Sequence, residues 1–475
     1  MKLTNKLLFL FLASISCAFA YGQQADSLTY YLGLAAKNNP TVLQRFTEYQ
    51  AALQKVPQVG SLSDPELNVG VFLSPMELVA GNQVADIRLM QMFPWFGVLK
   101  NAKDEMSLMA KARYESFRDA KLQVFFDLQQ TWNELYKVHQ AIQSSEKNLE
   151  ILHALERLSL VRFKAASSIG GNSSSSGGAM PSGALQAPSA GTSGMRTMGG
   201  TSSLNPGTTS NQAPSSMQGS SGGGGLADVY RIQIEIGELE NNIALLNNQL
   251  NSISVRFNSF LNRPVKTLVA LPDTLVAAIL YIPIEAVSDS MLINNPMLGM
   301  LNFEKQSIEA RKQMVTRMGY PMVGLGVNYS LINKNPMSTS EMNGSDMIMP
   351  MVTVTLPIYR KKYKAMQAEA ELMKTAASQG IQATSNALQT DYSEAVQNYQ
   401  DAQRRIALYK RQNQLANQSL SIQMKSFSSS GTGLTDLLRI RQQTLDYELK
   451  QVDAVADFNT AVAKLNRLMA VSQIQ

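Results

Sequence analysis

The chain has 475 residues, of which 44% are hydrophobic and 16% charged, and its formal net charge at neutral pH is +6. These values are typical of a folded protein, and without a dense run of Lys or Arg they give no indication of a nucleic-acid partner. The only cysteine, Cys17, leaves the chain without a disulfide framework or a multi-cysteine metal site.

The first residues have the pattern of a secretory signal peptide. Two lysines precede a short apolar run, and Ala18-Phe19-Ala20 is a small-x-small cleavage pattern. We predict that residues 1–20 are removed on export. The alternative is lipidation of Cys17, although Ser14 stands where bacterial lipoboxes usually carry Leu. No later apolar run is long enough for a membrane-spanning helix, so an exported chain of this kind is soluble, lipid-anchored or a β-barrel.

The first half of the mature chain, residues 21–264, predicts a series of six elements. Two helices separated by Asn39-Pro40 come first, then two strands that end at Pro94, then two long helices. We place the strands at about 65–74 and 84–93 and the long helices at about 98–165 and 226–262. Turn residues from Ser74-Pro75 to Gly81-Asn82 predict a loop between the two strands. Residues 166–225, which separate the long helices, are rich in Ser, Gly and Pro and predict a disordered insertion at a hairpin tip.

After a link at 265–283, residues 284–475 predict the same series again. Asn295-Pro296 separates two helices, and Pro357 follows the second strand. We place these strands at about 322–332 and 347–356, and the long helices at about 358–427 and 434–471. The stretch LADVYRI, which begins at Leu226, returns as LTDLLRI from Leu434, so we predict an internal duplication.

The strands alternate between apolar residues and small or polar residues. In the clearest case Val323, Leu325 and Val327 alternate with Gly324 and Gly326. Such a strand suits a sheet with one face in lipid and one toward water, and a soluble hairpin packed on helices is the alternative. The candidates for the water-facing side are Asp86, Arg88, Met90, Met92, Met347, Met349 and Met351.

The long helices predict coiled-coil packing. Residues 98–168 contain neither Gly nor Pro, and their apolar residues recur three and four positions apart. A stripe this narrow requires neighbouring helices of similar length.

With two copies in this order, the chain resembles the TolC family of outer-membrane efflux and secretion channels. The resemblance covers nearly the whole mature chain and rests on the two Asn-Pro pairs, the two strand-closing prolines and the hairpin tips. It implies a mixed α/β membrane protein. Three chains would form a 12-strand outer-membrane β-barrel, with four strands each, continued by a long α-helical periplasmic tunnel. The implied partners are two further copies, outer-membrane lipid, a periplasmic adaptor protein and the inner-membrane pump to which it binds, with no nucleic acid.

The same resemblance places the adaptor-docking surface at the hairpin tips. The matching residues are Arg162, Phe163, Leu226, Asp228, Val229, Gly433, Leu434, Asp436 and Leu437. From structure alone, an acid near a helix start stabilises the helix dipole and the leucines fill a coiled coil, so each residue can serve both purposes.

Nothing in the sequence indicates catalysis. The only histidines, His139 and His153, lie within a predicted long helix, and no phosphate-binding loop or acidic cluster with metal spacing is present. We therefore expect a channel that is not an enzyme and needs no cofactor.

The 25 methionines suggest a class of substrate. Thioether sulfur favours Cu(I) and Ag(I), so the hypothesis is export of copper or silver, with weak metal contacts in the insertion at Met180, Met195, Met198 and Met217. The alternative for these methionines is simple packing. The other functions considered are a drug, small-molecule or type I secretion exit channel, a stand-alone porin, and a periplasmic coiled-coil scaffold without a pore.

Overall fold

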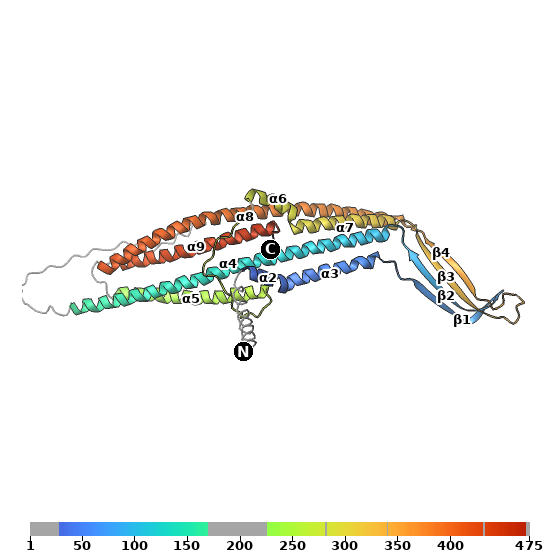
Figure 1. The fold of residues 1–475 in the computed structure, drawn as a ribbon, viewed down its shortest axis with the longest axis horizontal. Helices are drawn as coiled ribbons and strands as arrows, with labels where there is room; N and C mark the ends of the chain where they lie inside the picture. Colours follow the sequence, from blue (N-terminus) through green and yellow to red (C-terminus); the bar gives the residue numbers. More distant parts are fainter. Residues whose placement is uncertain (1–27, 170–225, 281–282, 340, 431–432, 472–475) are drawn as a thin grey trace, which may run out of the picture.

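The computed structural model describes residues 28–169, 226–280, 283–339, 341–430 and 433–471. They form an elongated molecule in which helices lie side by side and a sheet projects from one end (Figure 1). The predicted signal peptide and nearly all of the predicted insertion, with its four methionines, lie outside the described residues.

The two halves of the chain follow the same order of elements. The first half contains α2 (Leu28–Asn38), α3 (Pro40–Gly60), β1 (Glu66–Leu78), β2 (Gly81–Phe93), α4 (Val98–Ile169) and α5 (Leu226–Phe260). The second contains α6 (Ile284–Asn294), α7 (Pro296–Met318), β3 (Met322–Asn333), β4 (Met347–Thr355), α8 (Arg360–Ser430) and α9 (Leu434–Leu468).

Each Asn-Pro pair starts a helix and fastens it to the end of another. The Asn39 side chain accepts hydrogen bonds from the backbone N–H groups of Thr41 and Val42, at 3.0 and 3.3 Å, while proline occupies the first helical position. Its amide also donates to the Phe260 carbonyl at the end of α5, at 2.9 Å. In the second half Asn295 caps α7 in the same way and donates to the Leu468 carbonyl at the end of α9. The same dipeptide therefore sets the position of a short helix against a long one in both halves.

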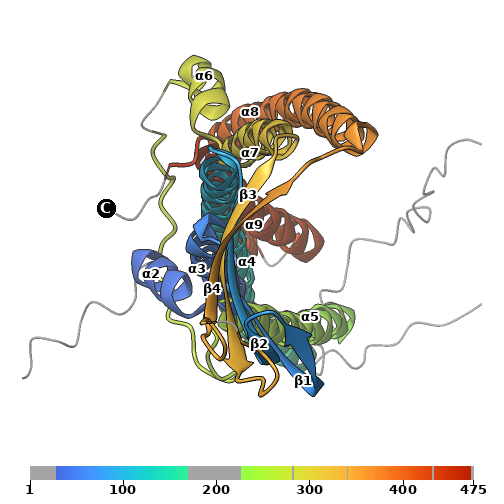
Figure 2. The ribbon, with the colours of Figure 1, turned by 90° about the vertical axis from the view of Figure 1, so that its right-hand side faces the viewer.

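The long helices pack against one another along the molecule. At 72 residues, α4 is about 108 Å long, and it packs against α3, α5, α7 and α9. The 71-residue α8 packs against α7 and α9. A large buried hydrophobic cluster lies midway along α4, where the rings of Trp132 and Phe257 meet that of Tyr31 from α2, with centroids 5.2–5.7 Å apart. The view from the sheet end shows α2 and α6 on the outside of this bundle (Figure 2).

Among the described residues, no helix combines the length and the apolar character needed to cross a membrane.

The four strands form one antiparallel sheet in the order β1-β2-β3-β4. β1 and β2 are longer than the sequence predicts, because the first hairpin turns at Val79–Ala80 and residues 75–78 continue the strand. The loop predicted at Pro75 is wrong, because this proline lies in an edge strand, where the register shifts between Val71 and Met76 and where a proline removes no required hydrogen bond. Within the described residues, β1 and β4 each have a partner strand on one side only.

Candidate functional site

Strand register gives the sheet two faces of different character. Met90 on β2 lies opposite Gly326 on β3, which lies opposite Met351 on β4. Because directly paired residues in an antiparallel sheet point to the same side, this row lies on one face. The neighbouring rows join Arg88 to Asn328 and Met349, Asp86 to Ser330 and Met347, and Met92 to Gly324 and Thr353. All seven residues selected from the sequence therefore lie on a single face, called here the polar face.

Glycines make room on the polar face for long side chains from the neighbouring strand. A Cβ atom added to Gly324 would lie 2.6 Å from the sulfur of Met92, and one added to Gly70 would lie 2.3 Å from a carboxylate oxygen of Asp86. Both distances are far below van der Waals contact. The Met92 and Asp86 side chains therefore lie over the backbone of the next strand, and this requires glycine beneath them.

The opposite face, called here the apolar face, is aliphatic and exposed. Leu67 on β1, Val327 on β3 and Val352 on β4 are 63%, 47% and 69% exposed, respectively. The strand register places Leu89, Ile87, Leu325, Ile348 and Val354 on the same face, and each of these is at least 40% exposed. No helix of the described chain covers this face, so it forms an apolar patch that continues across all four strands.

Aromatic residues surround the point where the strands pass into the helices. Trp95 stacks on Tyr320 with ring centroids 5.4 Å apart and an interplanar angle of 18°. Phe96 and Tyr359 lie near them in the chain connections and are each 84% exposed. Arg317, at the end of α7, donates to the Phe96 carbonyl at 3.1 Å and fastens the connection. The apolar face thus ends in a group of exposed aromatic rings.

At the far end of the sheet, the β3–β4 loop fastens onto the β1–β2 turn. The Gly344 backbone N–H donates to the Ala80 carbonyl at 2.8 Å, and the Ser338 hydroxyl donates to the Val79 carbonyl at 3.1 Å. Asp346 accepts from the Ile332 N–H at 3.0 Å and from the Tyr329 hydroxyl. The first two contacts join the two hairpins at this end of the sheet, and the Asp346 contacts hold the β3–β4 loop against β3.

At the opposite end of the molecule, the tips of the two helical hairpins share one hydrophobic cluster. It contains residues of α4, α5, α8 and α9, all at most 8% exposed: Leu152, Leu155, Ile232, Ile236, Leu420, Phe427, Leu434, Leu437 and Leu438. Burial of this size holds the α4–α5 hairpin against the α8–α9 hairpin.

Arg162 joins the two tips by polar contacts. Its guanidinium, on α4, donates to the carbonyls of Phe427 and Ser428 at 2.8 and 2.9 Å and lies 4.8 Å from the centre of the Phe427 ring. Both carbonyls belong to the last turn of α8, where a helix has no intrahelical donors and carries partial negative charge. A second contact runs from the Arg231 guanidinium on α5 to the Thr435 hydroxyl on α9.

The residues selected at the tips separate into buried and accessible groups. Val229, Leu434 and Leu437 are only 2%, 4% and 1% exposed, and Leu434 and Leu437 belong to the cluster that joins the hairpins. Leu226, Gly433 and Asp436 are exposed, and Arg162, Phe163 and Asp228 are half-buried. Sequence reasoning overlooked Ile232, Leu438 and the contact between Arg231 and Thr435. The sequence does indicate that Ile232 and Leu438 are buried, because they follow Val229 and Leu434 at the spacing of one helix face.

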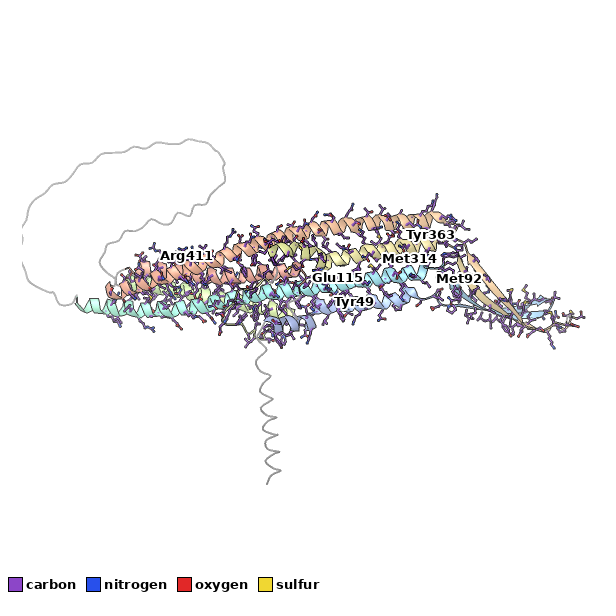
Figure 3. The ribbon with its side chains drawn as sticks, turned by 45° about the horizontal axis from the view of Figure 1, so that its top comes forward. Tyr49, Met92, Glu115, Met314, Tyr363 and Arg411 are labelled. Carbon is purple, nitrogen blue, oxygen red and sulfur yellow. The ribbon has the colours of Figure 1, made fainter. Side chains whose placement is uncertain are left out.

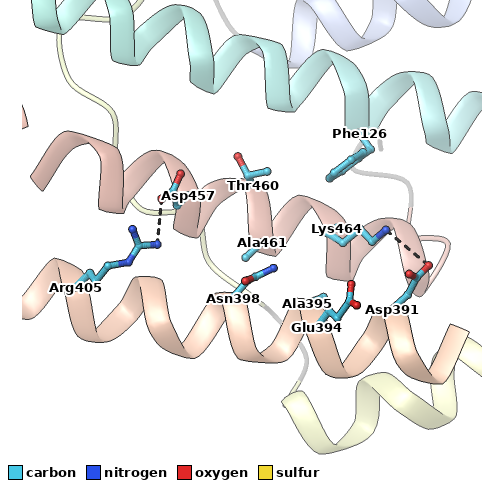
Figure 4. A pocket seen from close by; sticks show the side chains of 10 residues that line it. All are labelled: Phe126, Asp391, Glu394, Ala395, Asn398, Arg405, Asp457, Thr460, Ala461 and Lys464. Carbon is cyan, nitrogen blue, oxygen red and sulfur yellow. Dashed lines mark ion pairs between the residues drawn. The ribbon is translucent and has the colours of Figure 1, made fainter. Parts of the chain in front are cut away.

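A charged groove that the sequence gave no reason to expect lies between α8 and α9. Its volume is about 350 Å³, and Figure 4 shows its ion pairs, Arg405 with Asp457 at 3.0 Å and Lys464 with Asp391 at 3.7 Å. Lys137 on α4 adds pairs to Asp457 at 3.5 Å and to Asp453 at 3.2 Å. Because all of these groups are partly exposed, each pair contributes little to the stability of the fold.

Neither histidine belongs to a cluster that could bind a metal. His139 contacts Gln143 at 3.0 Å, and His153 lies 3.6 Å from Glu156. In the part of the chain that the structure describes, no group of three or more His, Cys, Asp or Glu residues could hold a metal ion.

Comparison with known proteins identifies the fold. No family model and no curated protein sequence matches the chain. Among solved structures, the outer membrane protein VceC of Vibrio cholerae matches with a TM-score of 0.66 at 11% identity, over 94% of this chain and 97% of that one. The CmeC outer membrane channel of Campylobacter jejuni matches with a TM-score of 0.67 at 12% identity, over 93% of this chain and 85% of that one. The MtrE outer membrane channel of Neisseria gonorrhoeae, in its open state, matches with a TM-score of 0.63 at 12% identity, over 93% of this chain and 88% of that one.

Proposed function

We propose that this chain, which has the TolC-family channel fold that its sequence predicts, is a subunit of an outer-membrane efflux channel. It would be a passive exit duct that receives substrate from an inner-membrane pump through a periplasmic adaptor. The two-faced sheet carries the proposal. Its apolar face is exposed across all four strands, its polar face holds Asp86 and Arg88, and its edge strands β1 and β4 each have one free edge in the described chain.

The free edges support assembly of three copies. In lipid, an unpaired strand edge leaves backbone groups without hydrogen bonds, so a sheet must close on itself. Strands of 9–13 residues are long enough to cross a bilayer when tilted. Four strands are too few to form a closed cylinder, whereas three copies that join β4 of one chain to β1 of the next would make a barrel of 12. The polar face would then line its lumen.

The helices support the same assembly in the periplasm. On α8, Leu408, Leu415 and Ile422 are 50%, 57% and 67% exposed and lie seven residues apart. That spacing is the heptad repeat of a coiled coil, and within the described chain no helix covers it. The stripe would pack against a helix of the neighbouring copy, so that 12 long helices form a tunnel.

The hairpin tips would be the adaptor-docking end. Since Val229, Leu434 and Leu437 are buried, docking falls to the accessible residues of the same set, which are Arg162, Phe163, Leu226, Asp228, Gly433 and Asp436. The proposed contacts therefore combine three charged side chains, those of Arg162, Asp228 and Asp436, with the apolar side chains of Phe163 and Leu226.

The methionines of the polar face support Cu(I) or Ag(I) as the substrate. Met90 and Met351 flank Gly326 in one row, Met92 lies over Gly324, and Met349 occupies the next row. Because glycines separate them, several thioethers would face a common space, and soft ligands of this kind suit monovalent copper and silver. Met180, Met195, Met198 and Met217 of the insertion would supply further weak contacts. Small organic molecules remain the alternative substrates.

The substrate proposal is tested by changing Met90, Met92, Met349 and Met351 to Leu. Leu keeps the size and apolar character and removes the sulfur. Silver tolerance of cells that depend on this channel should fall, while a control with Met373 and Met424 changed to Leu, both exposed on helix α8, should match the wild type. Equal tolerance in all three strains would remove the methionine face from the mechanism.

Channel function itself is tested by the conductance of the purified protein in planar bilayers. A tunnel narrowed at its helical tips should give small, discrete conductance steps. A stand-alone porin would conduct strongly, and a periplasmic scaffold would give no steps at all.

A further inference from the structure

A pocket of about 600 Å³ lies at the junction between the sheet and the helices. It opens where α7 passes into β3 and where β4 passes into α8, near Tyr363, which Figure 3 labels at the start of α8. Tyr320 and Tyr363 contribute aromatic walls. Gln367 donates to the Thr316 hydroxyl at 3.2 Å and so joins α8 to α7 beside the pocket. Both sides of the pocket are thus fixed by regular structure.

Positive charge collects at this pocket without a matching acid. Arg360, Lys361, Lys362 and Lys364 are all exposed, and Arg360 and Lys364 line the pocket. Within the described ranges, no carboxylate lies within 4.0 Å of any of these four cations. The first acids further along α8 are already engaged, since Glu369 pairs with Arg311 at 3.4 Å and Glu371 with Lys312 at 2.6 Å. The four cations are therefore available to an outside anion.

The rim on the other side of the pocket is apolar. Leu356 and Ile358 line the pocket and are 63% and 77% exposed. They directly continue β4, whose Val352 and Val354 belong to the exposed apolar face of the sheet. A ligand in this pocket would therefore meet cations at one end and a continuous aliphatic surface at the other.

We propose that this pocket binds the headgroup of an anionic phospholipid, whose acyl chains lie along Leu356 and Ile358 toward the apolar face. The Arg360 guanidinium suits two phosphate oxygens at once, Lys364 adds a point charge, and the tyrosine hydroxyls can donate to ester or phosphate oxygens. The proposal rests on the proposed function, because it places this junction at the inner surface of the membrane, where aromatic and cationic side chains favour the interface.

The equivalent junction of the first half lacks this chemistry. After Phe96 the chain carries only Lys100 and Lys103 before the acids Asp104 and Glu105. Each copy of the chain would therefore hold one such lipid, beside β4 and α8, and an assembly of three would hold three.

The position of Trp95 provides a direct test. This residue stacks on Tyr320 of the pocket wall, whereas Trp132, the only other tryptophan, is buried in the helical core at 3% exposure. In the purified full-length protein in neutral detergent, brominated phosphatidylglycerol should quench Trp95 fluorescence at lower concentration than brominated phosphatidylcholine. Changing Arg360 and Lys364 to Gln should weaken quenching by phosphatidylglycerol by roughly tenfold or more.

The matched control changes Lys410 and Arg411 to Gln. Both are exposed on α8, far from the sheet, as the label on Arg411 in Figure 3 shows. This variant should bind phosphatidylglycerol like the wild type. Three results would each overturn the lipid site and leave the channel proposal standing. They are an equal loss of quenching by phosphatidylglycerol in the two variants, equal quenching by the two lipids in the wild type, and full displacement of phosphatidylglycerol by inorganic phosphate. If the protein dissolves in water without detergent and neither lipid quenches its Trp95 fluorescence, both the lipid site and the channel proposal are overturned.

Discussion

Replacement of Val327 by Arg tests whether the apolar face meets lipid. Val327 lies in the middle of β3, is 47% exposed, and pairs with Leu89 on one side and Pro350 on the other. Because its side chain points away from the rest of the chain, an arginine at this position meets no neighbour that it must displace. The loss in the free energy of unfolding therefore depends on whether water or lipid surrounds the apolar face.

The two environments predict clearly different losses of stability. In water, a substitution at a half-exposed position away from special contacts changes the free energy of unfolding by about 0.5 kcal/mol or less. At the lipid-facing midplane of a barrel, an arginine costs about 2–4 kcal/mol, which corresponds to a roughly 30- to 900-fold change in the folding equilibrium. Val327 occupies the sixth position of the 12-residue strand, so we expect a loss within this larger range.

The assay is equilibrium unfolding in phospholipid vesicles, with Met349→Arg as the matched control. Met349 is 46% exposed and lies opposite Asn328 on the polar face. If the polar face lines an aqueous lumen, Met349→Arg should leave the free energy of unfolding nearly unchanged while Val327→Arg lowers it. Equal losses for the two variants would refute the assignment of the faces.

Three further predictions concern the helices. Leu437→Ala removes a side chain that is 1% exposed in the cluster joining the tips and should lower the free energy of unfolding by about 2–5 kcal/mol. Leu226→Ala, at a position that is 43% exposed, should change this free energy little, and denaturant titration of both variants checks the difference. Arg162→Met removes two hydrogen bonds to helix-end carbonyls, so hydrogen exchange in the last turn of α8 should become faster, and unchanged exchange would contradict the contact. Burial raises the pKa of Asp119 above its ordinary value, so the folded state binds this proton more tightly than the unfolded state. Stability is therefore lost as pH rises from the unfolded to the folded pKa, and Asp119→Asn should raise the Tm at neutral pH; a lower Tm would contradict this.

Local patterns in the sequence were sufficient to predict the framework of the fold. The Asn-Pro pairs predicted helix starts because asparagine is a good N-cap and proline suits the first helical turn, and Asn39 and Asn295 have these roles. Alternation in β2, β3 and β4 placed Arg88 and Met351 on one face and Val327 on the other, and the strand register agrees. Period-two patterning depends only on neighbouring residues, so it can be read from one strand at a time.

Features that depend on distant parts of the chain could not be predicted in this way. The turn at Val79–Ala80 was overlooked because Pro75 is a common loop residue, and only its place at the edge of the sheet makes it compatible with a strand. Arg162 contacts a carbonyl 265 residues away, and no local pattern indicates that contact. The burial of Leu434 and the exposure of Leu226, at equivalent places in two similar motifs, likewise follow from how the hairpins meet.

Cross-linking between β1 and β4 tests the central claim, which is that three copies complete one sheet. The test protein carries Val69→Cys on β1 and Val352→Cys on β4, and the chain has no other cysteine after Cys17. Within one chain these strands are separated by β2 and β3 and so lie about 14 Å apart, whereas strands paired between copies lie about 4.8 Å apart. A short bifunctional maleimide should therefore join neighbouring copies in the membrane and give bands up to a trimer and no larger, while either single-cysteine variant gives no trimer. A chain that stays at monomer mass would contradict the account.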